Sequence, residues 1–411
     1  MSDNGITEAF TNAYNNFDSR PLAGETLRRF YIDDFTKDAV NSIRTTIKIS
    51  ARYRKMLVIG HRGCGKSTIL NKVAEELNND FHLVSFSAAE TLNMNDVETI
   101  DILISIYLQI LNSMNDSNIN VPFQRFDDIM KSVKSKLKVT EAGVNLLKTL
   151  TFKIKVENES RAALREEFIN QIEILNNSIS DCIESIYKHY EDEDNNTKGK
   201  DVLIIIDDLD KLDTEFAEKV FFEQSHLLTM PEAKIIYTFP LETYYCEAFN
   251  TFRDRYDDEF ISLVVVAQEK NGDLGIQQLA KLVLQRIDKQ YIKPEALKKM
   301  ILFSGGLLRD LIKFMQDACK KAIVNDSDII DKDIAEQVIN ETANHYKRLF
   351  DFPNYKEDVK KIVSKSQRNE IENKDLIYLL KYLFVLEYRF KDNLWYEVHP
   401  CLKKVLEGEQ Q

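Results

Sequence analysis

Short apolar runs alternate with longer helical patterns along most of the chain. Five runs have the length and the Val, Ile and Leu content of strands that are buried on both faces. They are Met56–Gly60, Phe81–Phe86, Val202–Asp207, Lys234–Phe239 and Ile261–Ala267. Such strands, alternating with helices, predict an α/β domain with a five-stranded parallel sheet. Periodicity alone does not separate a short buried strand from a buried helix.

A long insertion, Leu92–Lys200, separates the second and third of these runs. Apolar residues recur at helical spacing in Ile100–Leu111 and in Leu164–Tyr187. Between them, apolar residues at every second position of Leu150–Val156 predict an exposed strand, which could pair with Val133–Val139. Lysines concentrate here, at positions 131, 134, 136, 138, 148, 153 and 155, as a solvated face or as a surface for a partner or nucleic acid.

The second half of the chain is predicted to be mainly helical. Helical patterns cover Gly275–Gln290, Pro294–Phe303, Leu307–Val324 and Ile371–Tyr388, followed by an extended segment Asn393–Val398 and a helix Cys401–Leu406. Pro294 stands at the favoured first position of its helix.

The clearest chemical signal follows the first predicted strand. Residues 60–68 read GHRGCGKST and match G-x-x-x-x-G-K-[ST] between a strand and a helix. Glycines allow successive backbone N–H groups to point at phosphate oxygens, and the helix N-terminus adds its positive dipole end. The predicted nucleotide-binding residues are Gly60, His61, Arg62, Gly63, Cys64, Gly65, Lys66, Ser67 and Thr68. Lys66 would contact the β- and γ-phosphates, and the Ser67 hydroxyl would bind Mg²⁺. Cys64 is a variable loop position or a redox residue.

A carboxylate cluster ends the third predicted strand. Asp207 is expected to hold Mg²⁺, and Asp208 to polarise the attacking water. The alternative is an acidic helix N-cap.

Further polar residues could complete such a site. Thr238 lies near the end of the fourth strand and could orient the water, or could be an ordinary β-branched strand residue. Arg309, after Gly305-Gly306, could reach the γ-phosphate, or could be a surface residue. Arg253 and Arg255 could each project into a neighbouring subunit, or could pair with nearby aspartates of their own chain.

Composition limits the class of function. The 411 residues are 44% hydrophobic and 30% charged, which is typical of a globular chain with two or three domains. The net charge of −12 disfavours a protein whose whole surface binds nucleic acid. Five scattered cysteines favour a reducing compartment. The sequence shows neither a signal-peptide pattern nor a membrane-spanning run, so a cytoplasmic protein is expected.

The order of these features resembles the AAA+ and STAND branches of the P-loop ATPases, especially origin-recognition-type and bacterial STAND-like members. The resemblance covers roughly Tyr31–Val324. It implies a helical lid and a C-terminal winged helix, with Trp395–Pro400 as the wing. The expected domains are an N-terminal segment (1–30), an ATPase domain (31–270, with the insertion at 92–200), a lid (271–345) and a winged-helix-like domain (346–411).

The resemblance also implies ATP and Mg²⁺ as cofactors and roles for individual residues. Lys66, Ser67 and Asp207 would bind ATP and Mg²⁺, Asp208 would activate water, and Thr238 and Arg309 would be the first and second sensors. Many family members have Glu where this chain has Asp208, which implies slow turnover.

Three functions are compatible with these features. The first is a slowly hydrolysing ATP switch that oligomerises or engages a protein partner, with antiphage defence as a setting suggested by resemblance alone. The second is a DNA-binding initiator or loader. The third is a nucleotide-binding scaffold without turnover.

Overall fold

The computed structural model describes residues 3–121, 143–191, 198–266, 272–350, 352–365 and 373–408. The chain divides into two compact units, and the chain passes between them four times. One unit contains Met1–Val40, Gly60–Asn71 and Phe260–Gln411. The other, the sheet unit, contains Asn41–Ile59 and Lys72–Glu259.

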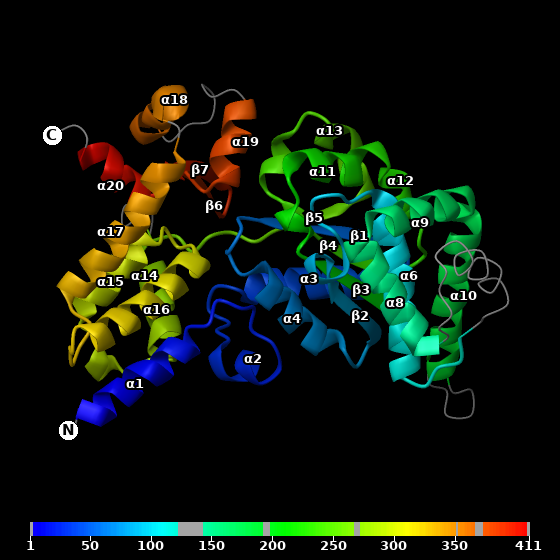
Figure 1. Ribbon diagram of the computed structural model, residues 1–411, viewed down its shortest axis with the longest axis horizontal. Coiled ribbons are helices and arrows are strands. Elements are labelled where there is room, and N and C mark those ends of the chain that lie inside the picture. Colours follow the sequence, from blue (N-terminus) through cyan, green and yellow to red (C-terminus); the bar gives the residue numbers. More distant parts are fainter. Residues whose placement is uncertain are drawn as a thin grey trace. The chain divides into compact units, whose positions relative to one another are not determined.

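A five-stranded sheet is the centre of the sheet unit (Figure 1). The strands are β1 (Lys55–Gly60), β2 (Phe81–Ser87), β3 (Asp201–Asp207), β4 (Lys234–Pro240) and β5 (Asp257–Phe260), in the order β2-β3-β4-β1-β5. β3 pairs in parallel with β2 and with β4. Every residue of β1 and β4 is buried, as apolar strands covered on both faces require. The predicted fold class is confirmed, and the first four strands lie where the apolar runs predict them.

Helices surround this sheet and form the insertion. They are α3 (Lys37–Ile49), α4 (Lys66–Leu77), α5 (Ala88–Thr91), α6 (Thr99–Asp116), α8 (Gly143–Val156), α9 (Asn158–Asn170), α10 (Ile172–Tyr190), α11 (Thr214–Glu218), α12 (Ser225–Thr229) and α13 (Phe249–Phe252). The 3₁₀ helices η1 (Leu209–Lys211), η3 (Glu242–Tyr245) and η4 (Arg253–Arg255) and the π-helical segment η2 (Lys219–Glu223) lie between them. Within the insertion, α6 packs against β2, and α10 packs against β3.

The fifth strand is not where the sequence predicts it. The apolar run that starts at Ile261 has no regular structure over its described residues 261–266, and β5 is the preceding polar segment Asp257–Phe260. Leu263 and Val266 are nevertheless buried. Burial of this run comes from packing without strand pairing, and an edge strand such as β5 needs no apolar pattern.

The predicted strand over Leu150–Val156 is also wrong, because this segment belongs to helix α8. Leu150 and Ile154 are 2% and 1% exposed, whereas Phe152 and Val156 are 58% and 55% exposed. Burial at positions i and i+4 is the pattern of a helix. The suggested partner, Val133–Val139, lies outside the described residues, together with Lys131, Lys134, Lys136 and Lys138.

Two lysines of the predicted basic face are engaged within the chain. Lys153 Nζ lies 2.8 Å from Glu157 Oε2, and Lys155 Nζ donates to the Glu90 carbonyl oxygen over 2.9 Å. These contacts support the solvated-face interpretation for this end of α8.

The other unit is mainly helical. Its elements are α1 (Asp3–Asn16), α2 (Gly24–Phe30), α14 (Gly272–Leu284), η6 (Lys289–Tyr291), α15 (Pro294–Phe303), α16 (Leu308–Val324), α17 (Lys332–Leu349), α18 (Phe352–Lys365), α19 (Asn373–Lys381), β6 (Val385–Phe390), β7 (Asn393–Val398) and α20 (Pro400–Gly408). α15 begins at Pro294, as predicted, and Asp331 caps α17 by accepting from the backbone N–H of Ile334 over 3.0 Å. α16 packs against α1 and α17, and α17 packs against α20.

The C-terminal segment differs from its prediction at one point. The helix expected over Ile371–Tyr388 ends at Lys381, and Val385–Phe390 is a strand that pairs antiparallel with β7. We refer to β6 and β7 together, Val385–Val398, as the hairpin. Helices α18 and α19 pack against it. The winged-helix assignment and the four domain bounds stay predictions.

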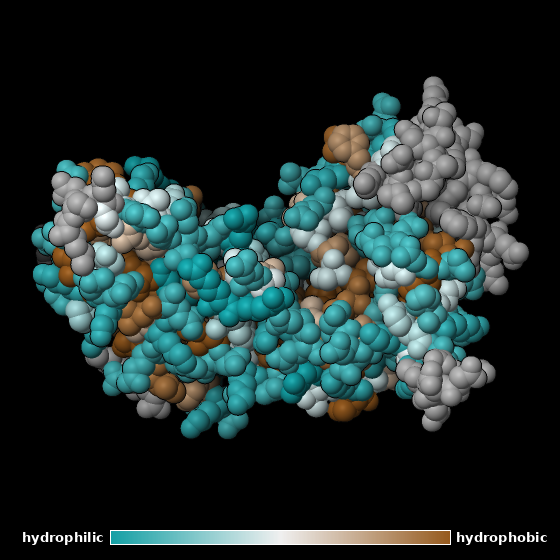
Figure 2. All heavy atoms as spheres, turned by 90° about the horizontal axis from the view of Figure 1, so that it is seen from below, coloured by the Kyte–Doolittle hydropathy of each residue, from teal (hydrophilic) through white to brown (hydrophobic). Residues whose placement is uncertain are grey.

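No described helix combines the length and the apolar character needed to cross a bilayer. Hydrophilic residues cover most of the face in Figure 2, with smaller hydrophobic patches between them.

Candidate nucleotide-binding site

The predicted phosphate loop starts at Gly60, the last residue of β1, and runs into the first residue of α4, Lys66. Gly63 and Gly65 have φ angles of +86° and +107°, which residues with a Cβ rarely adopt. A Cβ at Gly60 would lie 2.7 Å from the Ile261 carbonyl oxygen. Glycine is therefore required at all three positions for the backbone to take this path, as a loop that cradles phosphates needs.

Lys66 is buried, and its ammonium group is bound to the loop itself. Nζ donates to the carbonyl oxygens of Gly60 over 2.7 Å and His61 over 2.9 Å. These bonds hold a cation at the loop before a phosphate group supplies negative charge.

The start of α16 contacts the loop directly. The backbone N–H of Arg309 donates to the Gly63 carbonyl oxygen over 3.0 Å, and a Cβ at Gly63 would lie 2.6 Å from the Arg309 Cβ. Leu308 Cδ1 lies 3.0 Å from the corresponding position at Gly65. The structure thus brings Arg309 to the phosphate loop, and its side chain is exposed there.

Other loop residues have structural partners. Cys64 is buried and is not part of a disulfide. Thr68 Oγ1 accepts from the backbone N–H of Leu22 over 3.1 Å, and Asn71 Nδ2 donates to the Leu22 carbonyl oxygen over 2.9 Å. This pair of bonds fixes the segment before α2 against the first turns of α4. Arg62 and Ser67 are partly exposed.

His61 is buried, although it is part of the loop. Its Nε2 accepts from the backbone N–H of Glu387 over 2.7 Å. Burial, together with the nearby charge of Lys66, lowers the pKa of His61 to about 3. The imidazole is therefore neutral and is an acceptor at Nε2.

The acidic residues after β3 form a cluster in the sheet unit. Carboxylate oxygens of Asp207, Asp208 and Asp210 lie within 4.8 Å of one another. Carboxylate oxygens are ligands that Mg²⁺ prefers in proteins, so the residue types of this cluster fit this ion. When bound, Mg²⁺ would neutralise charge on the phosphate oxygens.

Asp208 has a φ angle of +68°. Asp and Asn adopt this left-handed conformation more readily than other residues with a Cβ. Its carboxylate accepts from Ser87 Oγ over 2.7 Å and lies 2.6 Å from Lys211 Nζ. The left-handed backbone thus favours Asp over the longer Glu at this position.

Thr238 is fully buried near the end of β4, and its side-chain oxygen accepts hydrogen bonds. Oγ1 accepts from the backbone N–H of Leu209 over 3.0 Å and of Asp210 over 3.4 Å. Thr238 therefore fixes the backbone directly after Asp208.

Sequence reasoning missed Ser87. It is the last residue of β2, stands in register with Asp207 and binds the Asp208 carboxylate. The signal that could have found it is a hydroxyl residue at the end of a strand that neighbours the acidic one.

Arg253 and Arg255 lie in η4, and both are exposed. Arg255 Nη1 donates to Ser225 Oγ over 2.8 Å. Asp257, one of the aspartates suggested as their partner, pairs with Arg54 instead.

A protein-family model matches part of the chain. The family model described as the KAP family P-loop domain matches residues 39–239. No curated protein matches the chain.

Several solved structures match over nearly the whole chain. Cdc6p from Pyrobaculum aerophilum shares 11% identity over 97% of this chain and 98% of its own, with a TM-score of 0.44. The Drosophila ORC bound to DNA shares 11% identity over 98% and 92%, also with a TM-score of 0.44. The ORC2 protein of Aeropyrum pernix, solved as ADPNP-ADP complexes, shares 8% identity over 96% and 98%, with a TM-score of 0.43.

The match at 39–239 covers the phosphate loop, the acidic end of β3 and Thr238. The predicted P-loop ATPase resemblance is confirmed, since residues 39–239 of this chain match the KAP family P-loop domain.

Proposed function

We propose that this protein binds ATP at Gly60–Thr68 and hydrolyses it slowly, as a switch that engages a protein partner or a second copy of itself. The conformation of the phosphate loop carries the proposal. Gly63 and Gly65 have left-handed φ angles, Lys66 is held at the loop, and α4 starts directly after Gly65. A loop of this geometry at a helix N-terminus suits an anion that carries several phosphates.

The proposed roles are those that the sequence motifs predict, and the contacts of Lys66, Arg309 and Thr238 support them. Lys66 would exchange its two carbonyl partners for phosphate oxygens, which are stronger acceptors because they are charged. Asp207 and Ser67 would hold Mg²⁺, and Asp208 would orient and polarise water. Arg309 would contact the γ-phosphate from the start of α16, and Thr238 would keep the segment after Asp208 in place.

Slow turnover is supported by the surroundings of Asp208. Both of its oxygens have donors, from Ser87 and Lys211, and these two contacts hold the carboxylate in its present orientation. A base held in this way needs rearrangement before it can accept a proton. A partner that promotes the rearrangement would stimulate hydrolysis. The setting in antiphage defence stays a prediction.

Nucleotide binding and phosphate release test this proposal separately. ADP with Mg²⁺ should raise the melting temperature of the wild type, since a ligand that binds only the folded state stabilises it. Lys66→Ala should remove most of this shift, and phosphate release from ATP should fall to background. Lys72→Ala is the matched control, because Lys72 lies on the same helix and pairs with Glu75. Equal ADP shifts in Lys66→Ala and the wild type would overturn the assignment.

A further inference from the structure

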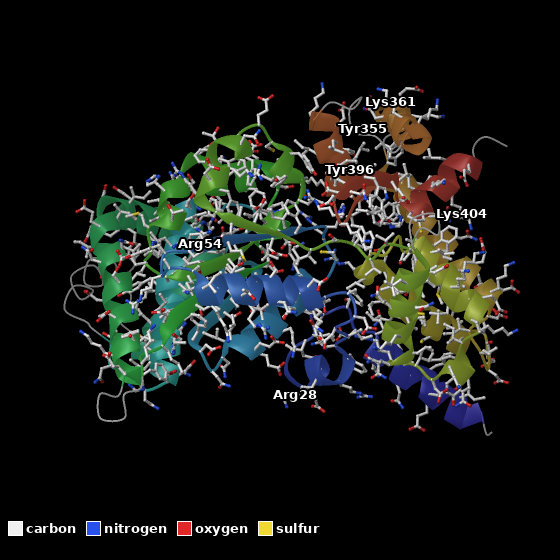
Figure 3. All side chains as sticks on the ribbon, turned by 180° about the vertical axis from the view of Figure 1, so that it is seen from behind. Arg28, Arg54, Tyr355, Lys361, Tyr396 and Lys404 are labelled. Atoms are coloured by element: carbon white, nitrogen blue, oxygen red, sulfur yellow. The ribbon has the colours of Figure 1, made fainter. Side chains whose placement is uncertain are left out.

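The hairpin contacts the phosphate loop through one buried hydrogen bond. The donor is the backbone N–H of Glu387 in β6, and the acceptor is His61 Nε2 at 2.7 Å. Both residues are buried, so water cannot replace either partner. Glu387 stands opposite Tyr396 of β7, which Figure 3 labels, so the residue bound to His61 is paired with the second strand of the hairpin.

A second contact joins the hairpin to the turn that precedes α16. Tyr388 Oη donates to the Gly305 carbonyl oxygen over 2.6 Å. Gly305 has a φ angle of +60°, and a Cβ there would lie 2.5 Å from Leu386 Cδ1. The absence of a side chain at Gly305 is therefore what admits β6 to this turn.

A third contact lies just after the hairpin. His399 is fully buried, its Nε2 lies 3.1 Å from Asp310 Oδ2, and its ring stacks on Tyr346 at a centroid distance of 4.4 Å. Asp310 follows Arg309, whose backbone N–H binds Gly63. The hairpin segment is thus bound to the loop and to the α16 turn that also contacts the loop.

Phosphate binding changes the first of these contacts most directly. In this structure the His61 carbonyl oxygen accepts from Lys66, while the His61 ring accepts from Glu387. When Lys66 turns to a phosphate oxygen, this carbonyl loses its charged partner. The peptide is then free to reorient, and the ring moves with it.

We propose that His61 is a positioning residue that couples phosphate binding at Lys66 to the hairpin Val385–Val398. The inference rests on the proposed nucleotide site. The nucleotide-free and nucleotide-bound states differ in the partner of Lys66 and in the hydrogen bond between His61 and Glu387. Nucleotide weakens this bond, and the hairpin then shifts against α16.

The chain carries its own reporter for this shift. Its one tryptophan, Trp395, lies in β7 and is buried. The indole stacks on Tyr388 with ring centroids 5.4 Å apart, and its Nε1 donates to Glu397 Oε1 over 2.9 Å. A movement of the hairpin changes these surroundings, and with them the indole emission.

The experiment uses the full-length protein and ADP with Mg²⁺, with calorimetry for binding and Trp395 emission for the hairpin. Emission of the wild type should change with the same midpoint as binding. His61→Gln and His61→Asn are matched amides, and the Gln oxygen can reach the Nε2 position, whereas the Asn oxygen stops near Nδ1. Gln should keep the emission change and Asn should lose it. His61→Asn should also bind ADP at least about fivefold more tightly than the wild type. In this variant ADP binding no longer has to weaken a hydrogen bond between residue 61 and Glu387.

The readouts separate the two proposals. No ADP binding in calorimetry would overturn the proposed function and the coupling together. If the wild type binds ADP without a change in Trp395 emission, the coupling alone would be overturned. The same holds if His61→Asn binds ADP and shows the full emission change. If His61→Asn does not fold, the Lys66→Met variant tests the coupling instead, because it removes the hydrogen bond from Lys66 to the His61 carbonyl oxygen. Its nucleotide-free emission should resemble that of ADP-bound wild type, and an emission equal to that of nucleotide-free wild type would overturn the coupling.

Discussion

Ser87 Oγ donates a hydrogen bond of 2.7 Å to Asp208 Oδ2, which joins the last residue of β2 to the residue directly after β3. The other carboxylate oxygen lies 2.6 Å from Lys211 Nζ. The proposed base is therefore held from both sides by residues of its own chain.

Ser87→Ala should raise basal ATP hydrolysis about three- to tenfold and leave ATP affinity unchanged. Removal of one donor frees the Asp208 carboxylate to rotate toward the attacking water. Steady-state phosphate release measures the effect. Ser85→Ala, at an exposed position two residues earlier on β2, is the control. A lower rate in Ser87→Ala would mean that this bond positions Asp208 for catalysis.

Asp208→Asn should bind ATP normally and hydrolyse it about 100-fold or more slowly, because the amide cannot accept a proton. The variant should fold, since Asn tolerates the left-handed φ of +68°. Asp208→Glu should lower stability by roughly 1 kcal/mol, because Glu adopts this left-handed φ less readily than Asp or Asn. Urea unfolding and single-turnover hydrolysis measure the two effects. Wild-type turnover in Asp208→Asn would place the base elsewhere, with Asp210 as the next candidate.

Acid should destabilise the protein partly through His61. Its pKa is about 3 in the folded protein and near 6.5 when unfolded, so the unfolded state binds more protons between these values. Stability is retained above pH 6.5 and falls as the pH drops below it. At pH 5 the loss from this group is on the order of 2 kcal/mol. Urea unfolding without nucleotide at pH 7 and pH 5 should show a smaller drop for His61→Gln, and equal drops would contradict the assignment.

Gly305→Ala should destabilise the protein more than Gly24→Ala. The two glycines have similar φ angles, +60° and +52°, so both variants bear about the same backbone cost. Only at Gly305 does a Cβ meet another side chain, Leu386. The additional cost should be about 1–3 kcal/mol, measured by urea unfolding. Equal losses of stability in the two variants would show that β6 accommodates the added Cβ without a loss of free energy.

Arg253 or Arg255 should act across a subunit boundary if the proposed switch assembles. Replacing each by Ala should then lower hydrolysis without weakening ATP binding. Mixing the inactive Arg variant with Lys66→Ala should restore part of the activity, because one subunit supplies the nucleotide site and the other the cation. Specific activity should also rise with protein concentration. Activity proportional to enzyme down to monomer dilution would assign both arginines to the surface.

The sequence predicted the elements whose local pattern agrees with their burial. The runs of β1 to β4 are mostly apolar and mostly buried, and the loop at Gly60–Thr68 has a motif with fixed spacing. The sequence-based prediction failed where the hydrophobic pattern of a segment does not match its burial. The Asp257–Phe260 strand is polar because it is at an edge, and in Leu150–Val156 a two-residue alternation coincides with a helical face.

The contacts of His61 lay beyond sequence reasoning for a different reason. The motif identifies His61 only as a variable loop position, and its partner Glu387 is 326 residues away. Its partner group is a backbone N–H, which every residue except proline has, so no side chain at position 387 marks the contact. Ser87 could have been identified from the sequence, since its position at the end of β2 follows from the predicted sheet.

The division of the chain sets the order in which the loop acquires its contacts during synthesis. Gly60–Asn71 belongs to the same unit as Phe260–Gln411, although nearly two hundred residues of the sheet unit are translated between them. At about 5–20 residues per second, Glu387 emerges roughly 15–65 s after His61. Until then the loop exists without the residues that bury its histidine. A nascent or C-terminally shortened chain would therefore present Lys66 and the loop glycines to nucleotide with neither Arg309 nor the hairpin in place.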